Sequence, residues 1–372
     1  MIISALKSNN STDKRSPIHR ETSKTLIDLG IEIWFEDNIG DGVNTSNEIF
    51  EELGLKKHSR NECLINSDLV ITNQPLTIEE VGLMKKNSTI LGMINPFSNQ
   101  ELIDTCCKSK VNLVSMEFIP RITRAQKMDV LSSQANLAGY VAVIEAAKHL
   151  STALPMMMTA AGTLKPAKVF VIGVGVAGLQ AIATAKRLGA RVEAFDTRDV
   201  VEEQVNSLGA KFVKIDLGET GETDQGYAKE LTEEQIKMQK ELQAKVCEKS
   251  DIVITTAQLF GRPAPQLIDS KTIDKMNPGS VIFDMAVESG GNVEGSQADE
   301  IIERNGIKII GISNLASKVS SHASLALSNN YNNWIVDFFD KDSLSINFDF
   351  EDEIIQSSVL VYDGKIMNER FK

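Results

Sequence analysis

The stretch that most constrains the fold of this chain runs over residues 168–196. It begins with the apolar run VFVI at 169–172 and continues with the glycine-rich turn GVGVAG at 173–178, which is followed by a helical pattern. A second short apolar segment ends in Asp196, 18 residues beyond Gly178. This order of strand, glycine turn, helix, strand and carboxylate is typical of a dinucleotide-binding βαβ unit.

Each glycine of the turn has its own physical reason. A tight first turn excludes a Cβ at Gly173, a pyrophosphate must approach the backbone at Gly175, and the helix must pack against the strand at Gly178. The N–H groups and the positive dipole end of the helix that begins near Val176 would hold the phosphates. A purely structural glycine turn is the alternative, but the flanking strands and the carboxylate favour a binding site. The expected contacts in this turn are Gly173, Gly175, Val176, Ala177 and Gly178.

Asp196 and Arg198 bear on which dinucleotide is bound. Asp196 would accept hydrogen bonds from the adenosine ribose hydroxyls and would repel the 2′-phosphate of NADP. Arg198 argues the other way, because a nearby arginine is how such sites accept that phosphate. Since the strand-tip position belongs to the aspartate, we expect NAD(H), with Thr197 as a further contact.

Composition narrows the class of protein. The 372 residues suffice for two domains, and 42% apolar with 24% charged residues is an ordinary globular profile. With 39 Lys and Arg against 51 Asp and Glu, the net charge of −12 disfavours nucleic acid and anionic membranes as partners. Four cysteines fit neither a zinc site nor a disulfide framework, so we expect free thiols, no metal and a reducing compartment. Neither a signal peptide nor a membrane span is recognisable, which predicts a cytoplasmic protein.

Strand-like and helix-like segments alternate along the chain, which predicts an α/β protein with two Rossmann-like, doubly wound parallel-sheet domains. The first domain would comprise residues 1–134 with 320–372, and the NAD(H)-binding domain residues 135–319. We expect the ligand cleft between the two lobes. In the second domain, residues 154–166 should form a hairpin or arm whose three methionines either join the core or contact a second subunit. Residues 217–232, rich in glycine and acid, would be a functional lid or a disordered segment.

Residues 120–132, PRITRAQKMDVLS, concentrate polar groups where the two domains should meet. They include the guanidinium of Arg121, the amide of Gln126, the carboxylate of Asp129 and the hydroxyl of Ser132. From composition alone, a polar loop in which Asp129 caps a helix is as good an interpretation as a binding site.

This segment, the glycine turn and the later sequence GSVIFDMAVESGGN at 279–292 together resemble the NAD(H)-binding subunit of proton-translocating nicotinamide nucleotide transhydrogenase, of the alanine dehydrogenase/transhydrogenase family. The similarity covers essentially the whole chain. It implies an oxidoreductase in which hydride passes directly between NAD(H) here and NADP(H) on a partner subunit, coupled to proton translocation by a membrane-spanning partner. It also implies a homodimer in contact through the methionine arm, placed peripherally at the cytoplasmic face of the inner membrane through its partners.

The resemblance also implies roles for individual residues. Arg121, Gln126 and Asp129 would form the catalytic loop that positions the nicotinamide, with Ser132 beside them. Tyr227 would be the lid residue that folds over the site and excludes water. The further cofactor contacts that the resemblance implies are Asp196, Thr197 and Arg198, together with Gly226, Gln239 and Gln258.

Related alanine dehydrogenases share the architecture but use a lysine and a histidine for acid/base work on the amino acid. The equivalent stretches here, VITNQP at 70–75 and LGMINP at 91–96, contain neither. Oxidation of an amine requires a proton acceptor, whereas hydride transfer between two nicotinamides requires none, so the absence favours transhydrogenation. An alanine-dehydrogenase-like amino acid oxidoreductase and a non-catalytic NAD-responsive module remain alternatives.

Overall fold

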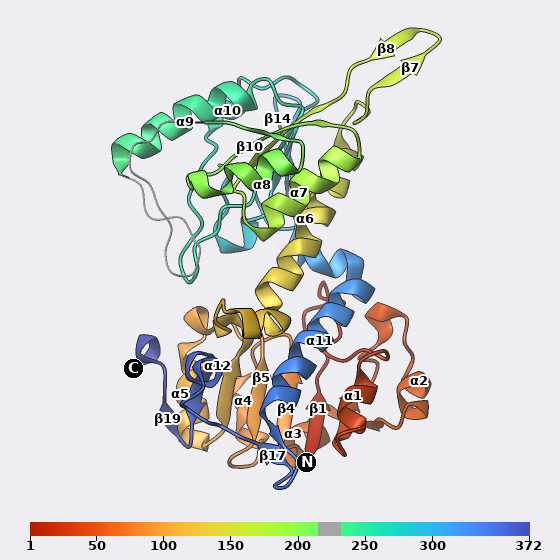
Figure 1. The fold of residues 1–372 in the computed structure, drawn as a ribbon, viewed down its shortest axis with the longest axis vertical. Coiled ribbons are helices and arrows are strands. Elements are labelled where there is room, and N and C mark those ends of the chain that lie inside the picture. Colours follow the sequence, from red (N-terminus) through yellow and green to blue (C-terminus); the bar gives the residue numbers. More distant parts are fainter. Residues whose placement is uncertain (215–231) are drawn as a thin grey trace. The chain divides into compact units, whose positions relative to one another are not determined.

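The computed structural model describes residues 1–214 and 232–372. The chain divides into two compact units, of which the first comprises Met1–Gln134 with Ser317–Lys372 and the second Ala135–Ala316. Each unit is built on its own, mainly parallel β-sheet with helices packed on it (Figure 1). The expected α/β class with two parallel-sheet domains is therefore confirmed.

The first unit contains an eight-stranded sheet in the order β19-β18-β6-β5-β4-β1-β2-β3. The strands from β6 to β3 are parallel, and β18 and β19 extend the sheet antiparallel. All residues of β4, β5 and β6 are buried, as expected for a parallel sheet covered on both faces. The strands are β1 (Ile2–Ala5), β2 (Glu32–Glu36), β3 (Lys56–His58), β4 (Leu69–Thr72), β5 (Thr89–Gly92), β6 (Asn112–Ser115), β18 (Val359–Tyr362) and β19 (Lys365–Ile366).

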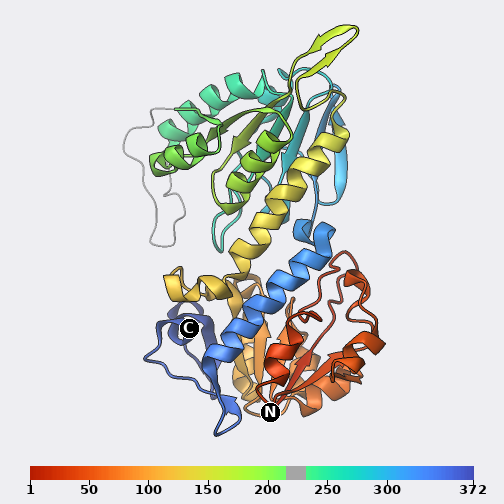
Figure 2. The ribbon, with the colours of Figure 1, turned by 45° about the vertical axis from the view of Figure 1, so that its right-hand side comes forward.

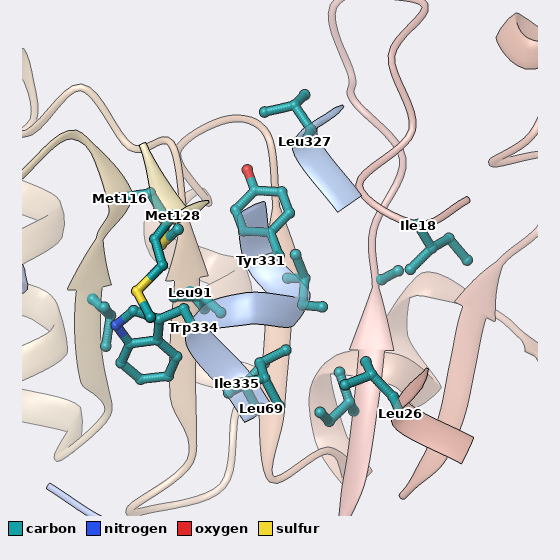
Figure 3. Packing of buried hydrophobic residues seen from close by; sticks show 14 of the residues in the cluster. Ile18, Leu26, Leu69, Leu91, Met116, Met128, Leu327, Tyr331, Trp334 and Ile335 are labelled. Atoms are coloured by element: carbon teal, nitrogen blue, oxygen red, sulfur yellow. The ribbon is translucent and has the colours of Figure 1, made fainter. Parts of the chain in front are cut away.

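Helix α11 forms the centre of the core of the first unit. Its Tyr331 and Trp334 are fully buried. Figure 3 shows Leu327, Tyr331, Trp334 and Ile335 of α11 packed near Leu69, Leu91, Met116 and Met128. The helices of this unit are α1 (Ser23–Ile27), α2 (Asn47–Glu52), α3 (Arg60–Asn66), α4 (Ile78–Leu83), α5 (Gln100–Ser109), α11 (Ser320–Phe338) and α12 (Glu353–Ser358), with a small hairpin of β16 (Phe339–Asp340) and β17 (Ser345–Ile346).

The second unit contains a seven-stranded sheet in the order β11-β10-β9-β12-β13-β15-β14, in which only β14 is antiparallel. The chain moves outward from β9 to β11 and then returns to the other side of β9 at β12. This reversal creates a topological switch point between β9 and β12, where doubly wound sheets bind ligands at the carboxyl ends of the strands. The strands are β9 (Lys168–Ile172), β10 (Arg191–Phe195), β11 (Lys211–Phe212), β12 (Ile252–Thr255), β13 (Val281–Asp284), β14 (Glu300–Arg304) and β15 (Ile307–Gly311).

The methionine arm is a hairpin of β7 (Met157–Thr159) and β8 (Gly162–Leu164) that projects from its unit (Figure 2). The side chain of Met158 is 85% exposed and that of Met156 61%, so the core interpretation of these methionines is wrong. The helices of this unit are α7 (Val176–Arg187), α8 (Glu202–Ser207), α9 (Glu233–Cys247) and α10 (Ser270–Ile273), and α6 (Val130–His149) enters it from the first unit. Within the described parts of the chain, no helix is both long and apolar enough to cross a membrane.

Candidate nucleotide-binding site

The glycine turn joins β9 to α7 at the switch point of the second unit. Gly173 has a φ of +96°, in the left-handed region, and a Cβ there would lie 2.5 Å from Thr256 Oγ1. A Cβ on Gly178 would lie 2.0 Å from the carbonyl oxygen of Gly173. A larger residue at either position would force the turn apart, so atoms of the chain itself require these two glycines.

Gly175 is different. Its backbone has φ −84° and ψ −165°, an extended conformation that any residue adopts. Among the described residues, no atom beyond its chain neighbours lies within 4 Å of the position that its Cβ would take. No side chain caps α7 at this end, so the N–H groups of its first turn keep their hydrogen-bonding capacity. The space at Gly175 therefore fits an anionic group that approaches the backbone at a helix N-terminus.

Asp196 directly follows β10, and its side chain is only 7% exposed. Its Oδ2 accepts the N–H of Val174 at 2.7 Å and Nη2 of Arg198 at 2.9 Å. Its Oδ1 accepts Nε of Arg198 at 2.8 Å and the backbone N–H of Arg198 at 2.9 Å. The four acceptor positions of the carboxylate are thus used within the chain. Ribose hydroxyls can bind Asp196 only by replacing some of the Arg198 donors, and Thr197 lies between the two residues of this pair.

The carboxyl end of β12 supports the glycine turn from the other side of the switch point. Thr256 Oγ1 donates a 2.9 Å hydrogen bond to the carbonyl oxygen of Gly173. The N–H of Ala257 donates to Asn292 Oδ1 at 3.1 Å, and Asn292 Nδ2 donates back to the Ala257 carbonyl at 2.9 Å. Gln258, one of the expected contacts, is exposed at this strand end and donates to the Met285 carbonyl at 3.3 Å. Sequence reasoning had identified only Gln258 in this group.

Asp284, the last residue of β13, holds the next loop in place. It is fully buried, and it accepts the N–H groups of Ala286, Asn292 and Val293 and the hydroxyl of Ser296 at 2.6–3.1 Å. No role for Asp284 was predicted from the sequence. The available signal was a carboxylate at the end of an apolar strand, followed by two adjacent glycines. Gly290 and Gly291 both take a positive φ in the loop that Asp284 organises.

One expected contact lies on α9, and two more fall outside the described residues. Gln239 is buried on α9. Gly226 and Tyr227, the expected lid residues, lie outside the described residues. Within the described ranges, no group of His, Cys, Asp and Glu side chains is arranged to hold a metal ion.

The segment expected to position the nicotinamide belongs to the first unit and contains the short 3₁₀ helix η4 (Thr123–Met128). Two of its cations are structural. Arg124 pairs with Asp352 of the α12 N-terminus, and Lys127 with Asp337 of α11, each at 2.6 Å. The hydrogen bond to Asp352 raises the pKa of Arg124. These pairs tie η4 to the helices that pack on it.

The remaining polar groups of this segment are exposed or partly buried. Arg121 and Gln126 are exposed, whereas Asp129 and Ser132 are partly buried. Asp129 Oδ1 accepts the N–H of Ser132 at 2.8 Å, and Oδ2 accepts the Ser132 hydroxyl at 2.6 Å. Asp129 therefore caps α6, as the polar-loop interpretation expects. The cap uses one acceptor position of each carboxylate oxygen and leaves the others for a ligand.

The carboxyl ends of β4 and β5 in the first unit are closed by a buried polar network. The Tyr331 hydroxyl lies 3.0 Å from Asn73 Oδ1 and 3.1 Å from the Thr72 carbonyl oxygen. Asn73 Nδ2 donates to the Arg15 carbonyl at 3.2 Å, and Arg15 Nη1 donates to Gln134 Oε1 at 3.2 Å. Burial raises the pKa of Tyr331, so this hydroxyl stays protonated. None of these four side chains is a proton acceptor near neutral pH, and the neighbouring carboxylate of Asp13 is buried and paired with Arg15 at 2.7 Å.

Comparisons with known proteins place the chain among relatives. Residues 6–138 match the alanine dehydrogenase/PNT N-terminal domain, and residues 142–369 match the corresponding C-terminal domain. The chain is 42% identical to the first part of NAD(P) transhydrogenase subunit alpha from Rickettsia prowazekii, over 99% of this chain and 96% of that protein. It is 43% identical to the protein of the same name from Rhodospirillum rubrum, over 99% and 98% of the two chains.

Solved structures extend these similarities. A transhydrogenase from Sinorhizobium meliloti superposes with a TM-score of 0.86 at 36% identity and covers 100% of both chains. An L-alanine dehydrogenase superposes with a TM-score of 0.80 at 20% identity, over 100% of this chain and 98% of that one. At that identity the second match shows a shared fold.

Proposed function

The chain belongs to the alanine dehydrogenase/PNT family, and we propose that it is the NAD(H)-binding component of a proton-translocating NAD(P) transhydrogenase. Hydride would pass directly between NAD(H) held here and NADP(H) held by a partner subunit. A membrane-spanning partner would couple this transfer to proton translocation. The relatives are named as the first part of an alpha subunit, which supports an enzyme of several subunits.

The choice of nucleotide is supported by the second unit. The space at Gly175 and the uncapped first turn of α7 would accept the pyrophosphate, with Val176, Ala177 and Gly178 around it. Asp196 favours NAD(H), because the carboxylate cancels the charge of Arg198, which would otherwise attract a 2′-phosphate.

The single observation that carries the choice of reaction is the closed polar network at Asn73 and Tyr331. An amino acid dehydrogenase requires a group that takes a proton from the substrate amine. At these strand ends the chain presents an amide and a phenol whose pKa is raised, both already hydrogen-bonded within the chain. Hydride transfer between two nicotinamides has no such requirement, so it suits this arrangement.

In this proposal the contribution of the chain is to position its nucleotide. Bound NAD(H) supplies the transferable hydride. The exposed Arg121 and Gln126 would hold the nicotinamide half, and Asp129, fixed by its bonds to Ser132, would orient the ring. Gln239, Gln258 and the lid residue Tyr227 would complete the enclosure.

Hydride transfer by the mixed subunits tests the proposal. We expect the chain, combined with an NADP(H)-binding transhydrogenase subunit, to reduce an oxidised NAD analogue with NADPH, whereas neither protein does so alone. Incubation of the chain alone with L-alanine and NAD should form no NADH. Transfer no faster than with the separate proteins would refute the proposal. NADH formation from alanine would favour the dehydrogenase, and NADH binding without transfer would favour the regulatory module.

Two substitutions at Asp129 separate its orienting role from its capping role. Asparagine caps helices about as well as aspartate, whereas alanine costs about 1 kcal/mol. We therefore expect Asp129→Asn to keep the unfolding temperature but to lose hydride transfer, because the charge is gone. Asp129→Ala should lower the unfolding temperature and also lose hydride transfer. If Asp129→Asn transfers hydride at the unchanged rate, only the helix cap matters.

We also propose a homodimer through the β7–β8 hairpin. Met156 and Met158 are too exposed to stabilise the unit that carries them, and flexible methionines adapt well to a partner surface. The membrane-spanning partner would then hold this homodimer at the cytoplasmic face of the membrane.

A further inference from the structure

Gly139 lies within the long helix α6, where glycine is a poorer helix former than alanine. Its Cβ, if present, would lie 2.2 Å from the carbonyl oxygen of Ala177, 3.0 Å from the Ala177 carbonyl carbon and 3.1 Å from its Cα. Both residues belong to the second unit. Backbone therefore meets backbone at this contact, and no side-chain rotation can relieve an added methyl group.

Ala177 is the second residue of α7, between Val176 and Gly178 in the turn that faces the space at Gly175. A shift of the Ala177 carbonyl moves the whole first turn, because the peptide groups of that turn are rigidly linked. We propose that Gly139 is a positioning residue for the nucleotide site. By allowing α6 to touch α7, it sets where the N–H groups of α7 stand relative to the phosphates. This inference rests on the proposed NAD(H) site.

The distances indicate a large effect. Real Cβ atoms essentially never approach another atom closer than 3.0 Å. Gly139→Ala therefore requires the two backbones to move apart by roughly 0.8 Å. Useful N–H to oxygen hydrogen bonds occupy only about 2.7–3.2 Å between donor and acceptor. A displacement larger than that window removes one or more phosphate contacts of the α7 N-terminus. Asp196, where the adenosine half is expected, is bonded to Val174, which precedes α7, so its position depends less on the first turn of the helix.

The test compares ligands with and without phosphates on the full chain. We expect Gly139→Ala to lower the affinity for NADH and for ADP by at least about tenfold. The affinity for adenosine should stay within about twofold of that of the unaltered chain. Gly82→Ala is the matched control, because Gly82 lies in α4 and its Cβ would meet no described atom within 4 Å. It should leave all three affinities unchanged. If the role of Gly139 is purely structural, Gly139→Ala should lower the affinity for adenosine as much as the affinity for NADH.

A second measurement covers the case in which Gly139→Ala does not fold. In the unaltered, deuterated chain, the amide resonances of Gly139 and Ala177 should shift on addition of ADP and remain in place with adenosine. Equal NADH and ADP affinities in Gly139→Ala and the unaltered chain overturn the inference alone, as does equal weakening of adenosine. The inference is also overturned if ADP shifts the amide resonance of Ala177 but not that of Gly139. If the unaltered chain fails to bind NADH, the proposed function falls and this inference with it.

Discussion

Replacement of Asp196 by asparagine should weaken NADH binding and strengthen NADPH binding. In the structure, Arg198 supplies three of the four donors to the carboxylate, and the guanidinium side chain is only 13% exposed. Asparagine keeps one acceptor for the Val174 N–H but removes the charge that Arg198 neutralises. The guanidinium, which also donates to the Val174 carbonyl at 3.2 Å, then carries an uncompensated positive charge that attracts a 2′-phosphate.

The magnitude follows from the hydrogen bonds that change. A hydrogen bond to a charged acceptor contributes about 1.5–3 kcal/mol, but the ribose hydroxyls only replace Arg198 donors, so we take one such bond as the net loss. That corresponds to roughly a 10- to 100-fold weaker affinity for NADH. For NADPH the repulsion disappears and an Arg–phosphate pair forms, which should contribute at least about tenfold in the opposite direction. The ratio of the two dissociation constants should therefore shift by about 100-fold or more.

The assay is titration of the nicotinamide fluorescence of NADH and NADPH with each variant. Glu193→Gln is the matched control, because Glu193 lies on β10, three residues before Asp196, and pairs with Lys211, which is 75% exposed. It removes the same charge and should leave the ratio unchanged. A preference that stays within about threefold in Asp196→Asn, or an equal change in Glu193→Gln, would refute the reasoning.

Three other substitutions and reactions test the rest of the structure. Met158→Asp should convert the proposed dimer into monomers by light scattering, whereas Met238→Asp on α9 should not, and a dimer that survives would remove the hairpin from the interface. Asp284→Ala removes the acceptor of five donors, of which the Thr255 hydroxyl keeps an alternative in the Phe283 carbonyl, and each of the other four costs about 1 kcal/mol or more. It should therefore lower the urea midpoint by circular dichroism but leave that of tryptophan fluorescence unchanged, since both tryptophans lie in the first unit. Burial raises the pKa of the Cys106 and Cys247 thiols to about 12, so neither should react with iodoacetamide near neutral pH until the chain unfolds, and mass spectrometry of native protein would reveal any exception.

Much of the second unit could be predicted from the sequence because its signals are local. The apolar run before Gly173, the helix after Gly175 and the strand before Asp196 are all found within a residue or two of the expected positions. The glycines at Gly173 and Gly178 were predictable because backbone sterics act over only a few residues. The family resemblance, built on the same turn and on residues 120–132, is confirmed by the matches over both domains.

The edge strands β3 and β14 and the short helix α3 were not predicted. Strand β3 is a three-residue polar edge, and β14 is an edge strand with mostly exposed residues, so neither shows the apolar pattern of a buried strand. Helix α3 is too short to show a clear helical period of apolar residues in the sequence. Its capping box was readable, since Ser59 and Glu62 have the required spacing and bond each other's backbone.

The pairing of side chains also lay beyond the sequence. Asp196 and Arg198 were weighed as competitors for the ribose end of the nucleotide, yet the structure joins them in one ion pair. Arg124 and Lys127 could not be distinguished from Arg121 by composition, because their partners Asp352 and Asp337 lie more than 200 positions further along the chain. Contacts of this range depend on the tertiary fold.

The first unit explains why a simple reversal to amino acid chemistry is not expected. A lysine in place of Asn73 would bring an ammonium group into a site that is 6% exposed, where an unpaired charge costs several kcal/mol. It would also break the contacts of Asn73 with Tyr331 and with the Arg15 carbonyl, and the freed space would still be bounded by the Arg15–Gln134 hydrogen bond. Several residues of this network would have to change together before a small acid could bind. The exposed Arg121 and Gln126 lie on a different segment of this unit, and under the proposed function they contact a nucleotide rather than a small acid.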